Sequence, residues 1–177
     1  MQTPVIWITG IPASGKTTIA KLLKEYYQKN NLQADILDGD ELRKTLSKDL
    51  GFSPENRKEH NRRVIFVAKL LSKNGVITIV PLITPYRETR ELARSEIPTF
   101  VEVYVKASLD ECIRRDPKGL YKRALAGEIR DLTGLQSPYE EPKNPEITLD
   151  TEKYSKEECL EIIISALKRL SYLKDKL

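Results

Sequence analysis

The chain contains a glycine-rich stretch, "GIPASGKT" at residues 10–17, whose residue types and spacing suit phosphate binding. It fits the pattern G-x-x-x-x-G-K-[ST], and it stands between an apolar run typical of a strand and an amphipathic run typical of a helix. Backbone N–H groups of such a loop and the positive end of the helix dipole both face a bound phosphate. We therefore expect a nucleotide site, the alternative being a glycine-containing turn that binds nothing. Its expected nucleotide-binding residues are Gly10, Ala13, Ser14, Gly15, Lys16, Thr17 and Thr18.

Two side chains of this stretch could take part in phosphoryl chemistry. Lys16 is expected to reach the β- and γ-phosphates of the nucleotide, and Thr17 is expected to ligate Mg²⁺ through its hydroxyl. Mg²⁺ is therefore a predicted cofactor.

The second motif of the chain is acidic: "DGD" at Asp38–Asp40 follows the second apolar run. Both carboxylates should lie just beyond the end of that run, near the glycine-rich stretch. One could hold a Mg²⁺-bound water while the other orients an acceptor hydroxyl. An Asp-Gly turn that caps a helix starting near Glu41 is an equally common use of these residues. The residues alone leave both interpretations open.

Short apolar runs rich in β-branched residues alternate with runs of helical periodicity. This order predicts an α/β fold, a mostly parallel five-stranded sheet with helices on both faces that binds ligands beyond the carboxyl ends of its strands. The expected strands are Val5–Thr9, Ala34–Leu37, Val76–Val80, Phe100–Val105 and Glu146–Leu149. A last helix over Ser155–Leu170 has an apolar face that would close the core.

The region from 119 to 145 interrupts this alternation. It contains three glycines and three prolines and offers little apolar surface to bury, so it is expected to be a mobile loop or lid at about 117–145.

Length and composition limit the remaining possibilities. The 177 residues suit a single domain over 1–177, and the charge of +4 arises from 30 basic and 26 acidic residues that are mixed along the chain. The chain has no long basic block and no apolar run of about 18 residues, so neither a nucleic-acid nor a membrane partner is expected. Two cysteines, Cys112 and Cys159, are too few for a disulfide framework, and we expect a cytoplasmic protein.

A phosphate-binding loop of this kind occurs in kinases, in nucleotide switches and in motors. The chain is short for a motor, and it lacks the N-K-x-D motif expected of a guanine-specific switch. The acidic pair after the second strand favours a kinase.

Seven stretches together resemble one family over nearly the whole chain: "GIPASGKTTIA", "DILDGDELR", "DLGFSPENRKEHNRR", "LITPYRETR", "VEVYVKASLDECIRRDPKGLYKR", "AGEIRDLTG" and "SPYEEPKNPEITLDT". Their order and spacing resemble those of the adenylyl-sulfate kinases. "DPKGLY" followed by "SPYEEPKNPE" is far more specific than the phosphate-binding loop, which many families share. The resemblance implies a P-loop nucleotide kinase fold and, by analogy, a homodimer. It also implies transfer of the γ-phosphoryl of MgATP to the 3′-hydroxyl of adenylyl sulfate, which gives 3′-phosphoadenylyl sulfate and ADP.

The resemblance also implies roles for individual residues. Lys16, Asp38 and Asp40 would be catalytic, with Asp38 holding the Mg²⁺-bound water and Asp40 meeting the 3′-hydroxyl. Arg43 and Arg57 would bind the anionic groups of the acceptor, whose geometry suits guanidinium forks.

Further residues match the family around the acceptor base and in the lid. Phe52 would lie against the substrate adenine, although its residue type alone favours a ring in the core. Ile83 and Thr84 would line the same base. The residues of the lid that would close over the phosphates are Lys118, Lys122 and Arg123.

Four positions depart from the family pattern. His60 replaces an Asn that contacts substrate. If His60 faces the substrate, its ordinary pKa near ~6.5 would place its titration in the working pH range. The alternative interpretation is that His60 is a solvent-facing residue of a helix. Thr84 replaces a Ser that is phosphorylated in some members, and direct in-line transfer needs no such intermediate. Leu125 replaces an Arg. Leu132 replaces a Phe that stacks on an adenine, which would forfeit about 0.5–1.5 kcal/mol of stacking.

Two other functions remain open from the sequence. One is a P-loop kinase of another small alcohol, such as a sugar acid or a nucleoside. The other is a nucleotide-binding regulatory protein without phosphotransfer.

Overall fold

A five-stranded parallel sheet forms the centre of the molecule in a computed structural model that describes residues 2–173. The strand order is β2-β3-β1-β4-β5, and the four neighbouring pairs are parallel. The strands are β1 (Val5–Thr9), β2 (Ala34–Ile36), β3 (Ile77–Pro81), β4 (Phe100–Lys106) and β5 (Ile147–Asp150). The predicted α/β fold and parallel sheet are therefore confirmed, and the expected strand bounds differ from the observed ones by one residue at most.

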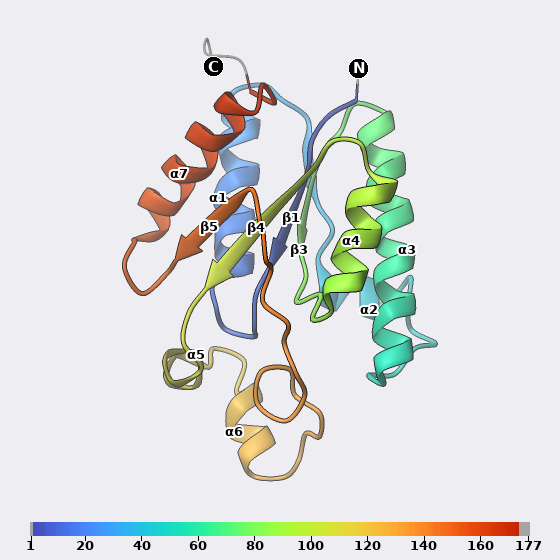
Figure 1. Cartoon of the computed structure of the whole chain (residues 1–177), viewed down its shortest axis with the longest axis vertical. Helices are drawn as coiled ribbons and strands as arrows, with labels where there is room; N and C mark the ends of the chain where they lie inside the picture. The colour runs from blue at the N-terminus through green and yellow to red at the C-terminus, as the bar shows by residue number, and fades with distance from the viewer. Residues whose placement is uncertain (1, 174–177) are drawn as a thin grey trace.

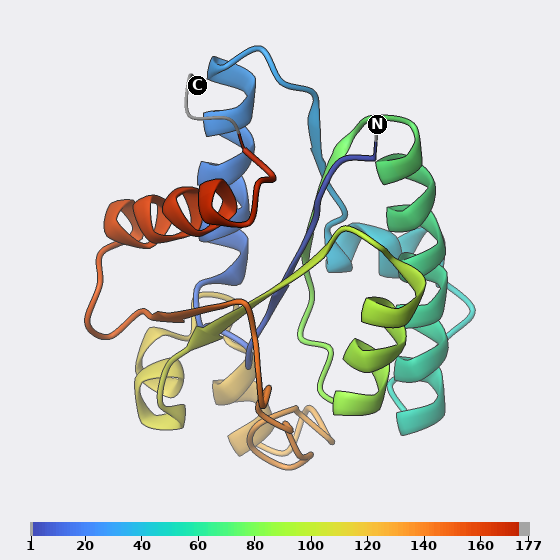
Figure 2. The same ribbon diagram turned by 45° about the horizontal axis from the view of Figure 1, so that its top comes forward.

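Helices cover both faces of the sheet, because its central strands are apolar on both sides. Every residue of β1 and β3 is buried. Helices α1 (Lys16–Lys29) and α7 (Lys156–Arg169) cover one face, and α3 (Pro54–Lys73) and α4 (Arg87–Glu96) cover the other (Figure 1). Figure 2 shows these helix pairs on opposite sides of the twisted sheet. Each face has its own apolar cluster, one that includes Ile8 and one that includes Trp7.

Local signals in the sequence start two of the longer helices, α3 and α7. Serines at positions 53 and 155 accept the backbone N–H three residues later, and Ser155 forms a reciprocal capping box with Glu158. The predicted closing helix is thus confirmed as α7. No helix among residues 2–173 is long and apolar enough to cross a membrane.

Short helices gather where the strands end. Helices α2 (Gly39–Lys44), α5 (Leu109–Arg115) and α6 (Leu120–Leu125) lie at the carboxyl end of the sheet, with α5 and α6 at the bottom of Figure 1. This is the end at which parallel α/β sheets bind their ligands.

The segment at 117–145 is more ordered than its composition suggests. Tyr121, Ala124 and Leu132 are buried, and they form a third apolar cluster with Cys112 of α5. The Tyr121 hydroxyl donates to the Pro12 carbonyl at 2.9 Å, which ties the segment to the phosphate-binding loop. The prediction of a loop with little apolar surface to bury was wrong here, because positions 121 and 124 share one face of α6 despite the flanking glycines.

Candidate active site

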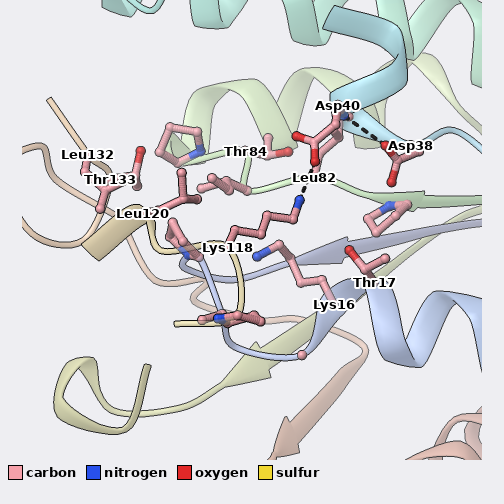
Figure 3. Close-up of a pocket in the computed structure, with 18 of the residues that line it drawn as sticks. Lys16, Thr17, Asp38, Asp40, Leu82, Thr84, Lys118, Leu120, Leu132 and Thr133 are labelled. Carbon is pink, nitrogen blue, oxygen red and sulfur yellow. Dashed lines mark hydrogen bonds and ion pairs between the residues drawn. The ribbon is translucent and has the colours of Figure 1, made fainter. Parts of the chain in front are cut away.

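A cavity of about 930 Å³ opens at the carboxyl end of the sheet. Its walls come from the segments that follow all five strands, together with the segment at 117–145 (Figure 3). β1 lies between β3 and β4, so the cavity occupies the place where the direction of strand succession reverses. Except for Gly10 and Ser14, the predicted site residues all line it: Ala13, Gly15, Lys16, Thr17, Thr18, Asp38, Asp40, Arg43, Phe52, Arg57, His60, Ile83, Thr84, Lys118 and Leu132.

The backbone of the glycine-rich loop is shaped in a way that requires glycine at two positions. A Cβ atom on Gly10 would lie 2.5 Å from the Val105 carbonyl oxygen, and Gly15 has a φ of 111° at the start of α1. No side chain among residues 2–173 caps the N-terminus of α1, so its first backbone N–H groups remain available to an anion. The Ser14 hydroxyl is buried and has no hydrogen-bond partner within the same residues. These features fit a bound polyphosphate.

Lys16 is buried in the floor of the cavity. Its ammonium donates to the carbonyl oxygens of Gly10 at 2.8 Å and Ile11 at 2.7 Å. Burial lowers the pKa of Lys16 to about 7, with a smaller effect in the same direction from Lys118 and an opposing one from Cys112. Because no carboxylate among residues 2–173 forms an ion pair with this ammonium, a bound phosphate would stabilise its protonated form strongly.

The acidic pair is divided between two uses. Asp38 is the N-cap of α2, and its Oδ1 accepts from the backbone N–H groups of Asp40 at 3.0 Å and Glu41 at 3.1 Å. The capping interpretation is therefore confirmed for Asp38, and the helix begins at Gly39 rather than near Glu41. Asp40 is exposed and forms an ion pair with Lys118. In Figure 3 the ends of Lys16, Lys118, Asp38 and Asp40 all face the same central space.

Arg43 and Phe52 form one rim of the cavity. The Arg43 guanidinium lies 4.9 Å from the centre of the Phe52 ring and donates to the Gly51 carbonyl at 2.8 Å. Phe52 is 66% exposed, so the interpretation of this residue as a core ring is wrong. The physical reason is its place in the connection between α2 and α3, beyond the end of the sheet and away from both apolar clusters.

Arg57 joins the two sides of the cavity. Its Nε donates to the Phe52 carbonyl at 2.7 Å, its Nη2 donates to the Asp131 carbonyl at 2.5 Å, and its Nη1 donates to the Thr133 hydroxyl. One guanidinium therefore holds the connection before α3 against the segment at 117–145.

His60 is buried, only 4% exposed, although it lies on a helix with many surface positions. Its Nδ1 forms a hydrogen bond of 2.9 Å with the Ser47 hydroxyl. Burial, followed by the charges of Arg43 and Arg63, lowers the pKa of His60 to about 4. Two expectations are thus wrong: His60 does not face solvent, and it does not titrate near its ordinary pKa in the free site.

The turn after β3 is held in a rare conformation. Thr84 has a φ of 42°, which for a β-branched residue costs on the order of 1–3 kcal/mol and persists only where the surroundings enforce it. Its buried hydroxyl accepts from Trp7 Nε1 at 2.9 Å and donates to Asn61 Oδ1 at 3.1 Å. Thr9 donates to the Ile83 carbonyl at 2.6 Å. The Thr84 hydroxyl is thus fully engaged inside the protein.

The residues of the 117–145 segment differ in how they meet the cavity. Leu132 and Arg123 line it, whereas Lys122 does not. Leu125 is 65% exposed and lies outside the lining, so its departure from the family pattern does not touch the cavity.

Sequence reasoning missed several residues of the lining. Arg115 donates to both the hydroxyl and the carbonyl of Thr151 at 2.9 Å, and Thr151 in turn donates to the Ser14 carbonyl at 3.0 Å. These contacts bring the start of the connection between β5 and α7 beside the phosphate-binding loop. Arg115 lies in the "IRRDPKGLY" part of a stretch that resembles the family, and this resemblance could have indicated that it lines the cavity. The other missed lining residues include Asn61, Thr133, Tyr154 and Lys156.

Comparison with known proteins decides the family. Residues 2–150 match the model of the family described as Adenylylsulphate kinase. The chain belongs to the adenylylsulphate kinase family. It is 51% identical over 173 residues to a probable adenylyl-sulfate kinase of Pyrococcus abyssi, a match that covers 98% of this chain and 99% of the relative. It is 49% identical over 168 residues to the adenylyl-sulfate kinase of a Picosynechococcus species, covering 95% of each chain.

A solved structure of the family has the same fold. The APS kinase CysC of Mycobacterium tuberculosis, in complex with AMPPNP and APS (adenylyl sulfate), is 42% identical to this chain and superposes with a TM-score of 0.91. The match covers 94% of this chain and 98% of that one. As a member of the family, the protein is an ATP-dependent phosphotransferase with a P-loop kinase fold.

A metal ion in this kinase would need ligands from outside the protein. Residues 2–173 contain no group of three or more His, Cys, Asp or Glu side chains placed to hold one. Mg²⁺ is commonly bound by one or two protein oxygens together with substrate phosphates and water. Thr17 and Asp38, which both line the cavity, fit that mode of binding.

Proposed function

We propose that the protein transfers the γ-phosphoryl group of ATP to the 3′-hydroxyl of adenylyl sulfate. The observation that carries this proposal is the shape of the cavity, in which a phosphate-binding loop and an arginine- and phenylalanine-lined rim belong to one continuous space. Phosphoryl transfer needs both substrates in line within a site that excludes water. A cavity with both kinds of wall provides for a nucleotide donor and an anionic acceptor that carries a base.

The loop at 10–17 would hold the donor. Backbone N–H groups at the start of α1 would bind the phosphate oxygens, and the Lys16 ammonium would exchange the carbonyls of Gly10 and Ile11 for the β- and γ-phosphates. When bound, Mg²⁺ would supply positive charge that offsets the charge of those phosphates. Thr17 and the free Oδ2 of Asp38 would hold it, while Asp38 Oδ1 keeps α2 in place.

Asp40 would act at the acceptor hydroxyl. A carboxylate in hydrogen-bond reach of the 3′-hydroxyl can orient it and accept its proton as the new bond forms. In the structure Asp40 instead pairs with Lys118. As the substrates bind, Lys118 would move from Asp40 to the polyphosphate, which would free the Asp40 carboxylate. Lys118 would then join Lys16 as a second cation beside the γ-phosphoryl group during its transfer.

The opposite rim would select the acceptor. Arg43 and Arg57 each retain N–H donors beyond those bound by the protein, and these would meet the phosphate and sulfate oxygens. The exposed Phe52 ring would lie against the adenine. Leu132 would cover the other side of the base with apolar contact but without ring stacking.

We further propose that the segment at about 117–145 acts as a lid within a single domain over 1–177. It lines the cavity through Lys118, Arg123 and Leu132, and it contains the helix that follows the quoted "DPKGLY" stretch. Closure of such a segment keeps water away from the phosphoryl group. The homodimer implied by the resemblance stays a prediction, which sedimentation of the purified protein would test.

An ADP-release assay tests the function. We expect ADP release with MgATP only when adenylyl sulfate is present, and we expect chromatography to identify 3′-phosphoadenylyl sulfate as the product. Parallel reactions contain a sugar acid, a nucleoside or no acceptor, and omission of the metal tests the need for Mg²⁺. Turnover with one of the other alcohols would instead support a different small-molecule kinase. Absence of turnover with every acceptor, together with tight ATP binding, would favour a regulatory protein.

A further inference from the structure

Arg90 of α4 is a buried cation outside the lining of the cavity. It is 3% exposed, and the proposed chemistry gives it no direct part. Its guanidinium meets three separate parts of the chain. Nη1 donates to the Thr84 carbonyl at 2.6 Å, Nη2 donates to the Glu140 carbonyl, and Nε lies 2.9 Å from Glu102 Oε1 on β4.

Two of these contacts, those with Thr84 and Glu140, connect the wall of the cavity with the lid. Thr84 is the strained residue of the turn that lines the acceptor side of the cavity, and Glu140 lies in the last part of the lid, where the chain returns to the sheet. The Arg90 guanidinium is therefore a direct connection between the acceptor-side turn and the stem of the lid. It also lies 5.7 Å from the centre of the Tyr139 ring.

A second connection runs beside the first. The buried Thr9 hydroxyl donates to the Ile83 carbonyl at 2.6 Å and is 2.9 Å from the Tyr139 hydroxyl, which must then be the donor of that hydrogen bond. Thr9 directly precedes Gly10 of the phosphate-binding loop. The same two neighbouring lid residues, Tyr139 and Glu140, are thus tied to the same turn at two points.

The charge of Arg90 explains why this arrangement is specific. A buried guanidinium is costly unless a carboxylate compensates it and carbonyls accept its N–H groups. Glu102, itself only 6% exposed, supplies the carboxylate and also contacts Arg94 Nη2 at 3.2 Å. A planar fork donates in fixed directions, whereas a lysine ammonium acts as a single point charge. Only the fork can donate to both carbonyls while its Nε stays in ion-pair distance of the carboxylate.

We propose that Arg90 is a positioning residue that fixes the Ile83–Thr84 turn against the Tyr139–Glu140 stem of the lid. The acceptor side of the cavity and the lid would then move as one unit. This inference rests on the proposed function, because it assumes that the turn contacts the acceptor. Loosening the connection should affect the acceptor more than ATP, whose phosphates lie on the separate loop at 10–17.

Arg90→Lys tests this role, with Arg94→Lys as the matched control. Both changes keep a positive charge beside Glu102, but Arg94 contacts Glu102 and Glu146 and makes no hydrogen bond to Thr84 or Glu140. For Arg90→Lys we expect kcat/KM for adenylyl sulfate to fall about 10–100-fold, mainly through KM, with a smaller change in KM for ATP. For Arg94→Lys we expect kinetics within about 2-fold of the parent, as for a surface change.

Limited trypsin digestion reports on the lid directly. Lys122 and Arg123 are exposed in the lid, and mass spectrometry can identify cleavage after them. With AMPPNP bound, we expect the lid of Arg90→Lys to be cut several-fold faster than that of the parent or of Arg94→Lys. A general loss of stability would instead expose sites throughout the chain.

Equal acceptor kinetics and equal lid cleavage in Arg90→Lys and Arg94→Lys would overturn the proposal. If Arg90→Lys does not fold, Tyr139→Phe replaces it, since this change removes the hydrogen bond to Thr9 but keeps the ring beside Arg90. An acceptor-specific rise in KM for that variant supports the proposal, and parent-like kinetics contradict it. A parent protein that is inactive with adenylyl sulfate contradicts the proposed function instead, and the trypsin comparison still decides the role of Arg90 in the lid.

Discussion

The buried His60 should make the stability of the protein depend on pH, and His60→Asn should remove that dependence. In the folded chain the pKa of His60 is lowered to about 4 by burial and by Arg43 and Arg63, from an ordinary value of 6.5. Between these two values the unfolded chain binds a proton that the folded chain does not. Unfolding is therefore favoured as the pH falls, and the free energy of unfolding decreases progressively between about pH 6.5 and about pH 4.

The size of the effect follows from the two pKa values. Because one pKa unit corresponds to about 1.4 kcal/mol, the parent should lose about 2 kcal/mol more than His60→Asn between pH 7 and pH 5. His60 is the only histidine in the chain, so no second imidazole contributes to this difference. Loss of the hydrogen bond to Ser47 in the variant shifts its stability by a constant amount and does not change the slope.

Urea unfolding of both proteins, without a histidine tag, measures this slope at several pH values from 7 to 5. The ring resonances of His60 in an NMR titration give its pKa directly, and we expect no shift of them above about pH 5.5. Parallel stability curves, or a titration midpoint near 6.5, would refute the reasoning. The same neutral imidazole should leave the KM for adenylyl sulfate with an equal pH dependence in parent and variant from pH 6 to 8.

Further predictions concern the two ends of the cavity. Lys16→Ala should lower turnover at least about 100-fold in the ADP-release assay, and near-parent turnover in a folded variant would contradict its role in the phosphate-binding loop. Because burial holds the pKa of Lys16 near 7 and a bound phosphate raises it, AMPPNP binding at pH 8 should take up protons. Calorimetry in buffers of different ionisation enthalpy measures this uptake, which Lys16→Met should abolish. Arg43→Ala and Arg57→Ala should each weaken adenylyl sulfate binding by about 10–150-fold with little change for ATP, and calorimetry showing the opposite selectivity would assign them to the ATP site. Asp38→Asn should keep the melting temperature, since Asn also caps helices, yet lower turnover; equal turnover would leave Asp38 with capping alone.

The parts of the molecule that the sequence predicted are those determined by near neighbours in the chain. The apolar runs of the sheet, the closing helix and the glycine-rich loop each depend on a few adjacent residues, and the structure has them where they were expected. The P-loop can be predicted because its pattern of residue types is short and continuous, although the need for glycine at position 10 also comes from the Val105 carbonyl.

The errors concern side chains whose surroundings come from distant segments. His60 is buried because the connection after α2 brings Ser47 over it, and periodicity along α3 carries no information about that connection. Phe52 has the residue type of a core ring but lies beyond the sheet. The lid was expected to be an open loop because of its glycines and prolines. Its composition does not indicate the apolar face of α6, which packs against Cys112 of another helix. The role of Arg90 depends on contacts with three other segments, and no local pattern indicates it.

The contacts of Arg57 have a consequence for the order in which the two ends of the cavity assemble. The two bonds that Lys16 makes to the phosphate-binding loop join residues 5 or 6 positions apart, with Ile11 and Gly10, although the same loop also accepts from the distant Tyr121 and Thr151. The bonds from Arg57 to Thr133 and Asp131 span 76 and 74 positions. Short-range contacts close at a small cost in chain entropy, whereas long-range ones require most of the fold to be in place. The contacts of Lys16 are therefore the more local ones, whereas the contacts of Arg57 form only once the segment at 117–145 has met α3. In a partly unfolded molecule we therefore expect selectivity for the acceptor to be lost before nucleotide binding.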